Sequence, residues 1–342
     1  MKKISILLAV LFVLSAALPV FAADAIGTEA NPIKVLFVPS VDAGIIVSGG
    51  EVMAKALHDA TGLYFDVSVP ASFAATVEEM CASPENTMGF IPPMPYVLGN
   101  QECGITVEAA AVRYGYSVYW TEFLVRRDSD IKELKDLNGK SWAYPDAIST
   151  SGYFVPSVMF DQMGIKPSEE TQAGGHPQAV KAVYNGEADF ATAFYSAYIA
   201  PDGVAAWKEG DNPDVPDDVL DSCAVTADGK DLDCGGYIVK DARANIREEA
   251  PDVVQKVRIL SLSTPIPNDT LAFSPKFPED TKKKIMDALY AFAKTPEWKT
   301  TIGSPDFYDW SDIAPAEDSA YDVIRALATA QGKTLADLDK KK

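Results

Sequence analysis

A run of hydroxyl side chains near the middle of the chain has the clearest chemistry. Ser149, Thr150 and Ser151 are consecutive and precede Gly152, within the segment PDAISTSGYFVP at residues 145–156. We call the three hydroxyl residues the hydroxyl run. Hydroxyl groups are neutral hydrogen-bond donors, and glycine lets an oxyanion approach the main chain closely. The pattern predicts an anion site that works through hydrogen bonds and adds no net charge.

The flanking elements would position these donors. Residues 139–145, GKSWAYP, follow the pattern of a turn and a strand, and residues 157–163 that of a helix that Gly164 ends. The first N–H groups of a helix have no intrahelical partner, and the helix dipole favours negative charge there. The alternative is that the hydroxyls only cap the helix, because Ser and Thr are common N-cap residues.

Pro156 leaves the exact start of that helix open. Proline has no backbone N–H, so it fits only the first turn of a helix or a kink. Either the helix begins near Pro156 and the hydroxyl run lies in a preceding turn, or the helix starts earlier and is kinked.

The first part of the chain alternates between strand and helix patterns. Compact apolar runs at residues 33–40, 64–70 and 87–93 are typical of buried strands, and amphipathic segments at 49–62 and 72–83 separate them. This alternation predicts an α/β layer with a parallel sheet. Ligand sites in such sheets lie at the carboxyl ends of the strands.

A second lobe is expected after residue 116. Residues 116–131 are long, β-branched and aromatic without a helical period, as in a strand that leaves one lobe and enters another. A second crossing is expected near 260–270, which places a cleft between the lobes. The expected division is 24–122 and 266–342 for lobe 1 and 123–265 for lobe 2, with an Asp-rich, Cys-containing insertion at about 201–245.

The composition excludes several classes of partner. The chain has 342 residues, 47% of them hydrophobic, and a net charge of −19. A surface this acidic argues against nucleic acid, whose phosphates need positive charge, and against anionic lipid.

The N-terminus has the pattern of a secretory signal peptide at residues 1–22. Lys2 and Lys3 precede an apolar stretch at 4–14, and LPVFAA supplies small residues for cleavage. The apolar stretch is shorter than the roughly 20 residues of a membrane span. We therefore expect a periplasmic or cell-surface protein, with an uncleaved anchor as the alternative.

The four cysteines fit an oxidising compartment. There is no C-x-x-C motif and the chain has only two histidines, which argues against a zinc site. We expect two local disulfides, Cys81–Cys103 and Cys223–Cys234, with free buried thiols as the alternative. We expect no bound metal and no cofactor.

Several motifs together resemble one family. STSGYFVP at 149–156, GGH at 174–176 and NGEADFA at 185–191 are similar to segments of the phosphonate-type periplasmic substrate-binding proteins of ABC transporters, which bind phosphonate, phosphite or phosphate. Weaker matches are MPYVLG at 94–99, FLVRRDSDIKELKDLNGK at 123–140 and STPIPNDTLAF at 263–273. The resemblance implies a two-lobed, type II-like periplasmic binding protein fold with a cleft between the lobes and two hinge crossovers.

The resemblance also implies roles for individual residues. The hydroxyl run would grip the oxyanion from lobe 2, and His176 would donate a hydrogen bond to it, with the imidazolium as one possible form. Tyr96 would line the cleft from lobe 1. Asp269 would accept a hydrogen bond from a protonated ligand oxygen or pair with a ligand amine. Ser196 stands where members that bind aminophosphonates have a second acid, which argues against such a ligand.

The function that the resemblance implies is that of a solute-binding component of an ABC importer, without enzymatic activity. Its partners would be a small anionic ligand and a membrane permease, and we expect a monomer. One alternative is a binder of another anion, such as a sulfonate or a phosphorylated metabolite, and another is a sensor subunit that presents its ligand to a receptor. A secreted serine hydrolase is disfavoured because the chain lacks a G-x-S-x-G elbow.

Overall fold

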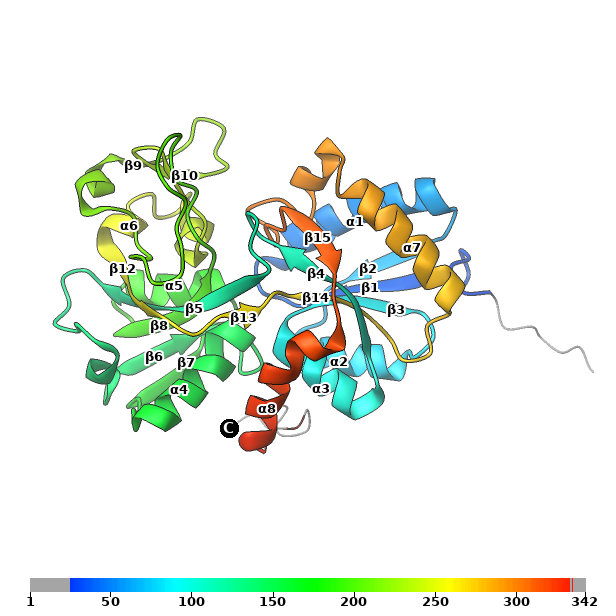
Figure 1. Ribbon diagram of the computed structural model, residues 1–342, viewed down its shortest axis with the longest axis horizontal. Helices are drawn as coiled ribbons and strands as arrows, with labels where there is room; N and C mark the ends of the chain where they lie inside the picture. Colours follow the sequence, from blue (N-terminus) through cyan, green and yellow to red (C-terminus); the bar gives the residue numbers. More distant parts are fainter. Residues whose placement is uncertain (1–24, 333, 335–342) are drawn as a thin grey trace, which may run out of the picture.

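The computed structural model describes residues 25–332 and 334, which fold into two lobes that stand side by side in Figure 1. The expected signal peptide at 1–22, the start of lobe 1 at residue 24 and the chain end at 335–342 lie outside the described residues. Within the described part, no helix has both the length and the apolar character needed to cross a membrane.

The first lobe is built on a mixed sheet of six strands. Its strand order is β15-β4-β14-β3-β1-β2, in which β1, β2 and β3 are parallel and β14, β4 and β15 add antiparallel pairs. The strands are β1 (Ile33–Phe37), β2 (Phe65–Ser68), β3 (Thr87–Ile91), β4 (Thr106–Val112), β14 (Thr270–Phe273) and β15 (Asp312–Pro315). The helices are α1 (Ala43–Thr61), α2 (Phe73–Ala82), α3 (Pro93–Cys103), α7 (Glu279–Phe292) and α8 (Asp322–Ala330), with short 3₁₀ turns at Pro296–Thr300 and Asp318–Tyr321. The predicted strand and helix alternation of the first hundred residues is confirmed.

The second lobe has its own mixed sheet in the order β12-β5-β8-β6-β7, with β13 paired to β5. The strands are β5 (Val118–Arg126), β6 (Ser141–Tyr144), β7 (Glu169–Gln172), β8 (Phe190–Tyr195), β12 (Val257–Leu262) and β13 (Ile266–Pro267). The helices are α4 (Val155–Met163), α5 (His176–Tyr184) and α6 (Val253–Lys256), with a π-helical turn η2 (Thr150–Phe154) and 3₁₀ turns at Leu134–Leu137, Asp217–Ser222 and η4 (Ala242–Ile246).

Two crossovers join the lobes. The chain passes from β4 to β5 at residues 113–117 and from β13 to β14 at residues 268–269. β5 pairs with β8 from Trp120 onward, so it belongs to the second sheet over most of its length. The strand pairing therefore favours boundaries near residues 117 and 268 over the expected ones at 122 and 265.

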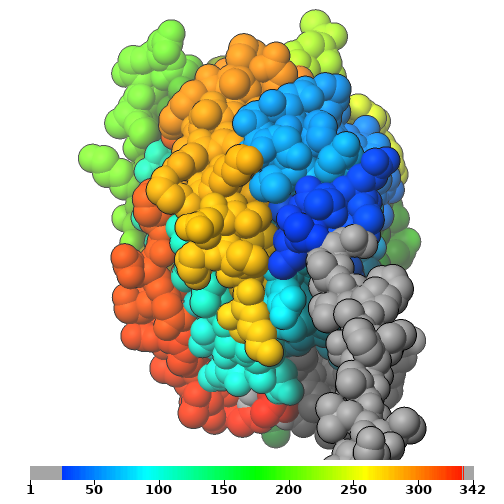
Figure 2. Space-filling model, turned by 90° about the vertical axis from the view of Figure 1, so that its right-hand side faces the viewer, coloured from blue at the N-terminus to red at the C-terminus, as the bar shows by residue number. Residues whose placement is uncertain are grey.

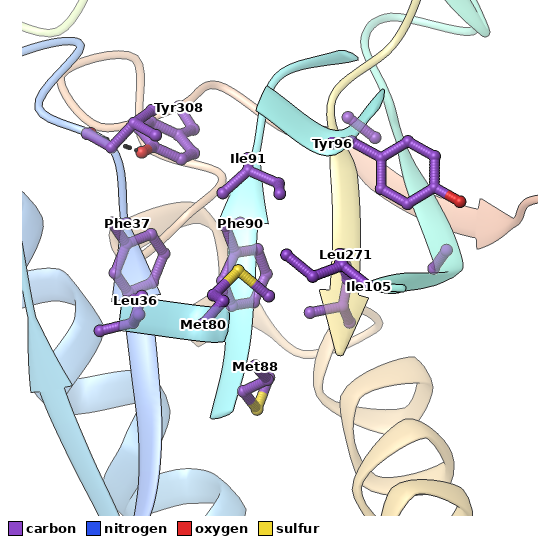
Figure 3. Packing of buried hydrophobic residues seen from close by; sticks show 14 of the residues in the cluster. Leu36, Phe37, Met80, Met88, Phe90, Ile91, Tyr96, Ile105, Leu271 and Tyr308 are labelled. Atoms are coloured by element: carbon purple, nitrogen blue, oxygen red, sulfur yellow. Dashed lines mark hydrogen bonds between the residues drawn. The ribbon is translucent and has the colours of Figure 1, made fainter. Parts of the chain in front are cut away.

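A large buried apolar cluster fills the first lobe and extends into the second. In the first lobe, Phe37 and Phe90 stack with ring centroids 4.8 Å apart, and Met80, Met88 and Leu271 are buried beside them (Figure 3). Helices α1 and α7 lie side by side on the face of this lobe that points away from the second (Figure 2). Ile148, Phe154, Val155 and Val158 of the second lobe belong to the same buried apolar cluster, so the lobes are packed against each other where η2 and α4 begin.

Both predicted disulfides are confirmed. Cys81–Cys103 joins α2 to α3, and Cys223–Cys234 joins β9 (Cys223–Val225) to β10 (Leu232–Cys234). The described residues contain no free cysteine and no group of three or more His, Cys, Asp or Glu side chains placed to hold a metal ion.

The expected insertion has more structure than its irregular sequence indicated. It contains a three-stranded antiparallel sheet in the order β11-β10-β9. The strands are β9 (Cys223–Val225), β10 (Leu232–Cys234) and β11 (Tyr237–Val239). Strands of three residues are too short to give a readable alternation, so sequence periodicity could not reveal them.

Candidate ligand-binding site

A cavity of about 60 Å³ lies between the two lobes. Residues that follow parallel strands line it: Val38 and Ser40 follow β1, Pro92 follows β3, and Ser149 follows β6. The carboxyl ends of strands from both sheets therefore face the same space, which is where open α/β sheets bind ligands.

The hydroxyl run lies in the π-helical turn η2, ahead of α4. The wide turn is closed by the N–H of Phe154, which donates to the Ser149 carbonyl at 2.9 Å. The Ser149 hydroxyl accepts the N–H of Gly152 at 3.1 Å, so it caps the turn, and it also lines the cavity together with Ser151. Capping and a place at the cavity are therefore combined in one residue. The N–H groups of Thr150 and Ser151 are in the first turn, where a helix offers no intrahelical acceptor.

Pro156 leaves two carbonyls of the π-helical turn without a backbone donor. α4 begins at Val155, so Pro156 lies in its first turn, as the first of the two predicted alternatives requires. Proline offers no N–H to the carbonyls of Ser151 and Gly152, and hydroxyls from the sheet supply the missing donors. Thr121 on β5 donates to the Ser151 carbonyl at 2.8 Å, and Thr192 on β8 donates to the Gly152 carbonyl. The sheet thus fixes the position of the hydroxyl run.

Thr150 has a different role from its two neighbours. Its hydroxyl accepts the N–H of Met94 at 2.8 Å, at the start of α3 in the first lobe. Thr150 is buried but is not one of the described residues that line the cavity. In this structure Thr150 joins the lobes, whereas Ser149 and Ser151 face the ligand space.

His176 begins α5 and lines the cavity with 5% of its surface exposed. Its Nε2 lies 3.5 Å from the Ser149 hydroxyl, and its Nδ1 has no hydrogen-bond partner among the described residues. Burial, with a further contribution from the Arg113 cation, lowers the pKa of His176 to about 3. The ring is therefore neutral, and the imidazolium form considered above is not the one that this environment favours.

The buried neutral histidine gives a test of stability against pH. Its folded pKa lies below its ordinary value of 6.5, so the unfolded chain binds the proton more tightly and stability falls as the pH drops below 6.5. We expect the free energy of unfolding to lose on the order of 3 kcal/mol from this residue between pH 7 and pH 4. His176→Gln should lack that loss in urea denaturation, and His58→Gln, at the only other histidine, should retain it. An equal acid loss in the wild type and in His176→Gln would contradict the assignment.

Arg113 lines the cavity, although no motif in the sequence predicted it there. It follows β4 at the first crossover, and its side chain is 10% exposed. Its Nη2 lies 2.7 Å from Asp269, its Nη1 donates to Asn268 at 3.1 Å, and it also donates to the Tyr308 carbonyl. The available signal was a lone arginine directly after the apolar strand 106–112. A charge at the end of a buried strand needs a partner, and here the partner is Asp269.

Asp269 lies at the second crossover and lines the cavity. Its carboxylate pairs with Arg113, so the two charges balance each other beside the cavity. Tyr119 lies against the same pair, with its ring centroid 5.7 Å from the Arg113 guanidinium carbon. Burial, with a further contribution from the Asp269 carboxylate, raises the pKa of Tyr119 well above its ordinary value, so its hydroxyl is neutral.

Tyr96 does not lie where the resemblance placed it. Its side chain is fully buried in the first-lobe core (Figure 3). Its hydroxyl donates to Asp318 at 2.6 Å. Its ring packs edge-on against Tyr321. The tyrosine lies within α3, whose start carries Met94 toward Thr150 while Tyr96 packs into the lobe. From the first lobe, Phe73, Ser40 and Tyr308 line the cavity instead.

A protein family matches the chain over nearly all of its described residues. A family model described as the phosphonate periplasmic substrate-binding protein of ABC transporters matches residues 35–321. The chain belongs to this family. The match covers both lobes and every candidate site residue, which confirms the resemblance found in the sequence motifs.

Individual members of the family are distant. The phosphonates-binding periplasmic protein of Escherichia coli K12 is 25% identical over 217 residues, which are 61% of this chain and 50% of that protein. The phosphate-import protein PhnD of Mycolicibacterium smegmatis is 28% identical over 171 residues, 46% of this chain and 53% of that protein. The chain therefore spans about half the length of the curated relatives it matches.

Solved structures confirm the two-lobed fold. A binding protein component of an ABC phosphonate transporter from Pseudomonas aeruginosa superposes with a TM-score of 0.65 at 17% identity, covering 91% of this chain and 90% of the other. PhnD1 from Prochlorococcus marinus, in complex with methylphosphonate, gives a TM-score of 0.64 at 12% identity, covering 88% of this chain and 98% of the other. At these identities the similarity establishes the fold alone.

Proposed function

We propose that the chain is the extracytoplasmic solute-binding component of an ABC importer and that it binds a phosphorus oxyanion between its lobes. The observation that carries the proposal is the cavity in which Ser149, Ser151 and His176 of the second lobe face Arg113 at the first crossover. Membership of the phosphonate-binding family supports the same class of ligand.

The donor set fits a tetrahedral oxyanion. Such an ion presents several acceptor oxygens, and the serine hydroxyls, the first-turn N–H groups and the imidazole supply neutral donors around it. Arg113 supplies the positive charge that the acidic surface lacks, and Asp269 compensates that charge when the site is empty. The ligand is then held by short directional bonds, which keeps its release feasible.

Asp269 favours phosphorus over sulfur oxyanions. A carboxylate beside the cavity repels a fully ionised sulfate or sulfonate, but it accepts a hydrogen bond from a protonated phosphonate or phosphate oxygen. Because Asp269 already pairs with Arg113, it is a weak partner for a ligand amine. Ser196 supplies no second acid. We therefore propose a ligand without an amino group.

Closure of the lobes is part of the proposal. The Thr150 hydroxyl accepts the backbone N–H of Met94, and the backbone N–H of His176 donates to the Ser40 carbonyl at 3.2 Å. The hydroxyl run and α5 therefore both contact the first lobe. Motion about the two crossovers would make and break these contacts, exclude water from the ligand and shape the face that a permease recognises. We propose that the protein acts as a monomer with such a permease.

Hydrolysis is disfavoured even though Ser149 and His176 are neighbours. The 3.5 Å separation is long for a nucleophile and its base, and the Ser149 hydroxyl already accepts the N–H of Gly152. His176 Nδ1 has no orienting carboxylate among the described residues, and a pKa of about 3 makes the ring a poor base. The arrangement holds an anion better than it activates a serine.

Isothermal titration of the mature protein tests the ligand class. The panel is phosphite, phosphate, methylphosphonate, 2-aminoethylphosphonate, sulfate and methanesulfonate. We expect saturable binding of at least one phosphorus oxyanion without an amino group, and binding of the two sulfur compounds at least 100-fold weaker. Binding of a sulfur compound alone, or of none of the phosphorus compounds, would contradict the proposal.

A further inference from the structure

The insertion reaches the ligand cavity. Val239 at the end of β11, Lys240 directly after it and Ala244 in η4 line the same cavity as Ser149 and Ser151, and we call Val239, Lys240 and Ala244 the insertion wall. The first lobe contributes Pro305 and Phe307, from the loop before β15, to the lining. The insertion therefore bounds the ligand space and is more than a surface loop.

A buried arginine holds the insertion wall against the first lobe. The Arg247 side chain is 2% exposed, and it donates to the carbonyls of Gly229 at 2.9 Å and Ala244 at 3.0 Å. Its remaining Nη2 lies 2.7 Å from Asp306 of the first lobe. One guanidinium thus ties together the β9–β10 connection, η4 and the facing lobe, so the wall has a fixed position when the lobes are closed.

A second polar contact fixes the inner side of the wall. The Lys240 ammonium pairs with Asp231 at 2.6 Å and lies 5.0 Å from the ring centroid of Tyr114, whose hydroxyl donates to Asp309. Tyr114 and Asp309 both have left-handed backbone conformations, with φ of 52° and 54°. Non-glycine residues adopt this region only when the surroundings hold them there. The wall therefore packs against a constrained part of the first crossover.

The enclosed volume is small. A water molecule needs roughly 10–15 Å³ of such space, so a cavity of about 60 Å³ holds only four to six of them. A tetrahedral oxyanion with one small substituent has a similar number of heavy atoms. Val239, Ala244 and Phe307 give part of the lining an apolar surface, which limits the space for a ligand substituent.

We propose that the insertion wall is the specificity element of this protein and confines its ligands to compact oxyanions with a substituent of about one heavy atom. The inference rests on the proposed function, because it concerns the substituent of the same oxyanion. Val239 and Ala244 set the limit of size, and the Arg247–Asp306 pair keeps the wall in place. An insertion of this kind narrows the ligand range without changing the oxyanion contacts.

Titrations with phosphite, methylphosphonate and n-propylphosphonate test the proposal. We expect the wild type to bind propylphosphonate at least 30-fold more weakly than the tighter of the two small ligands. Val239→Ala removes two methyl groups from the wall. It should reduce at least fivefold the ratio between the affinity for the tighter small ligand and the affinity for propylphosphonate. Val225→Ala, in β9 of the same small sheet and away from the cavity, is the matched control and should leave the ratio unchanged.

A second variant protects the test against a folding defect in the first. Ala244→Val adds bulk to the wall and should weaken the binding of methylphosphonate at least fivefold relative to the binding of phosphite. Equal affinity of the wild type for propylphosphonate and methylphosphonate would overturn the inference. It would also be overturned if neither Val239→Ala nor Ala244→Val changed the affinity ratios between the ligands. Failure of these three ligands and of phosphate to bind the wild type would instead refute the proposed function, so the two failures are distinguishable.

Discussion

Replacing Arg113 by methionine is expected to weaken binding of the phosphorus oxyanion about 100-fold or more. Lys230 and Lys240 also line the cavity, and Lys240 pairs with Asp231. The Arg113 guanidinium is the cation that lies against the Tyr119 ring and helps to lower the pKa of His176. Removing one partner of a buried, hydrogen-bonded charge pair typically costs about 2–5 kcal/mol or more of binding free energy. That free energy corresponds to a loss of roughly 30-fold to several thousand-fold in affinity. Isothermal titration of the purified variant measures the effect.

The same change leaves Asp269 buried without its partner, so stability must be separated from binding. An uncompensated buried charge destabilises a fold by about 3–5 kcal/mol. The double variant Arg113→Met with Asp269→Asn removes both charges and should recover most of that loss in urea denaturation, while binding stays weak. Arg126→Met, which breaks an exposed pair with Asp128 on the second lobe, is the matched control and should bind normally. Wild-type affinity in the stable double variant would show that Arg113 is not a ligand contact.

Gly152→Ala is expected to destabilise the protein by about 3 kcal/mol or more, at the upper end of what overpacking costs. A Cβ at this position would lie 2.1 Å from Cγ of Pro145 and 2.8 Å from the Ser149 hydroxyl. Pro145 is a rigid ring at the end of β6, so the π-helical turn must shift away. Because the Ser149 hydroxyl shifts with the turn, ligand affinity should fall as well. Urea denaturation and titration measure the two effects.

Gly164→Ala separates steric overlap from the ordinary cost of replacing a glycine. Gly164 ends α4 with φ of +69°, and a Cβ there would meet no atom within 4 Å. Its substitution by alanine should lower the free energy of unfolding by about 1 kcal/mol, because the backbone is strained, and should leave ligand affinity unchanged. If Gly152→Ala proved no more destabilising than Gly164→Ala, the close packing of the hydroxyl run against Pro145 would be wrong.

The parts of the site that could be predicted from sequence are local. A strand, a run of hydroxyls with a glycine and a helix are contiguous, so their relative positions follow from backbone geometry, and Ser149 and Ser151 do line the cavity. His176 follows the next strand of the same sheet, and the carboxyl ends of parallel strands meet at one edge. The alternation of strands and helices predicted the layered architecture for the same reason.

The parts that could not be predicted depend on distant contacts. Arg113 and Asp269 are 156 residues apart, and only the crossing of the two hinge segments brings them together. The position of the Tyr96 side chain depends on the orientation of α3 against the sheet. That orientation places the ring in the core and lets the hydroxyl donate to Asp318. The insertion wall needs Arg247 to meet Asp306, 59 residues later, and no local pattern encodes that contact.

A crystal structure of the mature protein with its tightest-binding phosphorus oxyanion tests the central claim most directly. We predict that the phosphorus lies between the lobes, with its oxygens on Ser149, Ser151 and His176 of the second lobe and on Arg113 at the crossover. The surface groove lined by Gln178, Lys181 and Arg247 also carries cationic side chains and is the competing location. Ligand density in that groove, with the cavity between the lobes holding only water, would contradict the account.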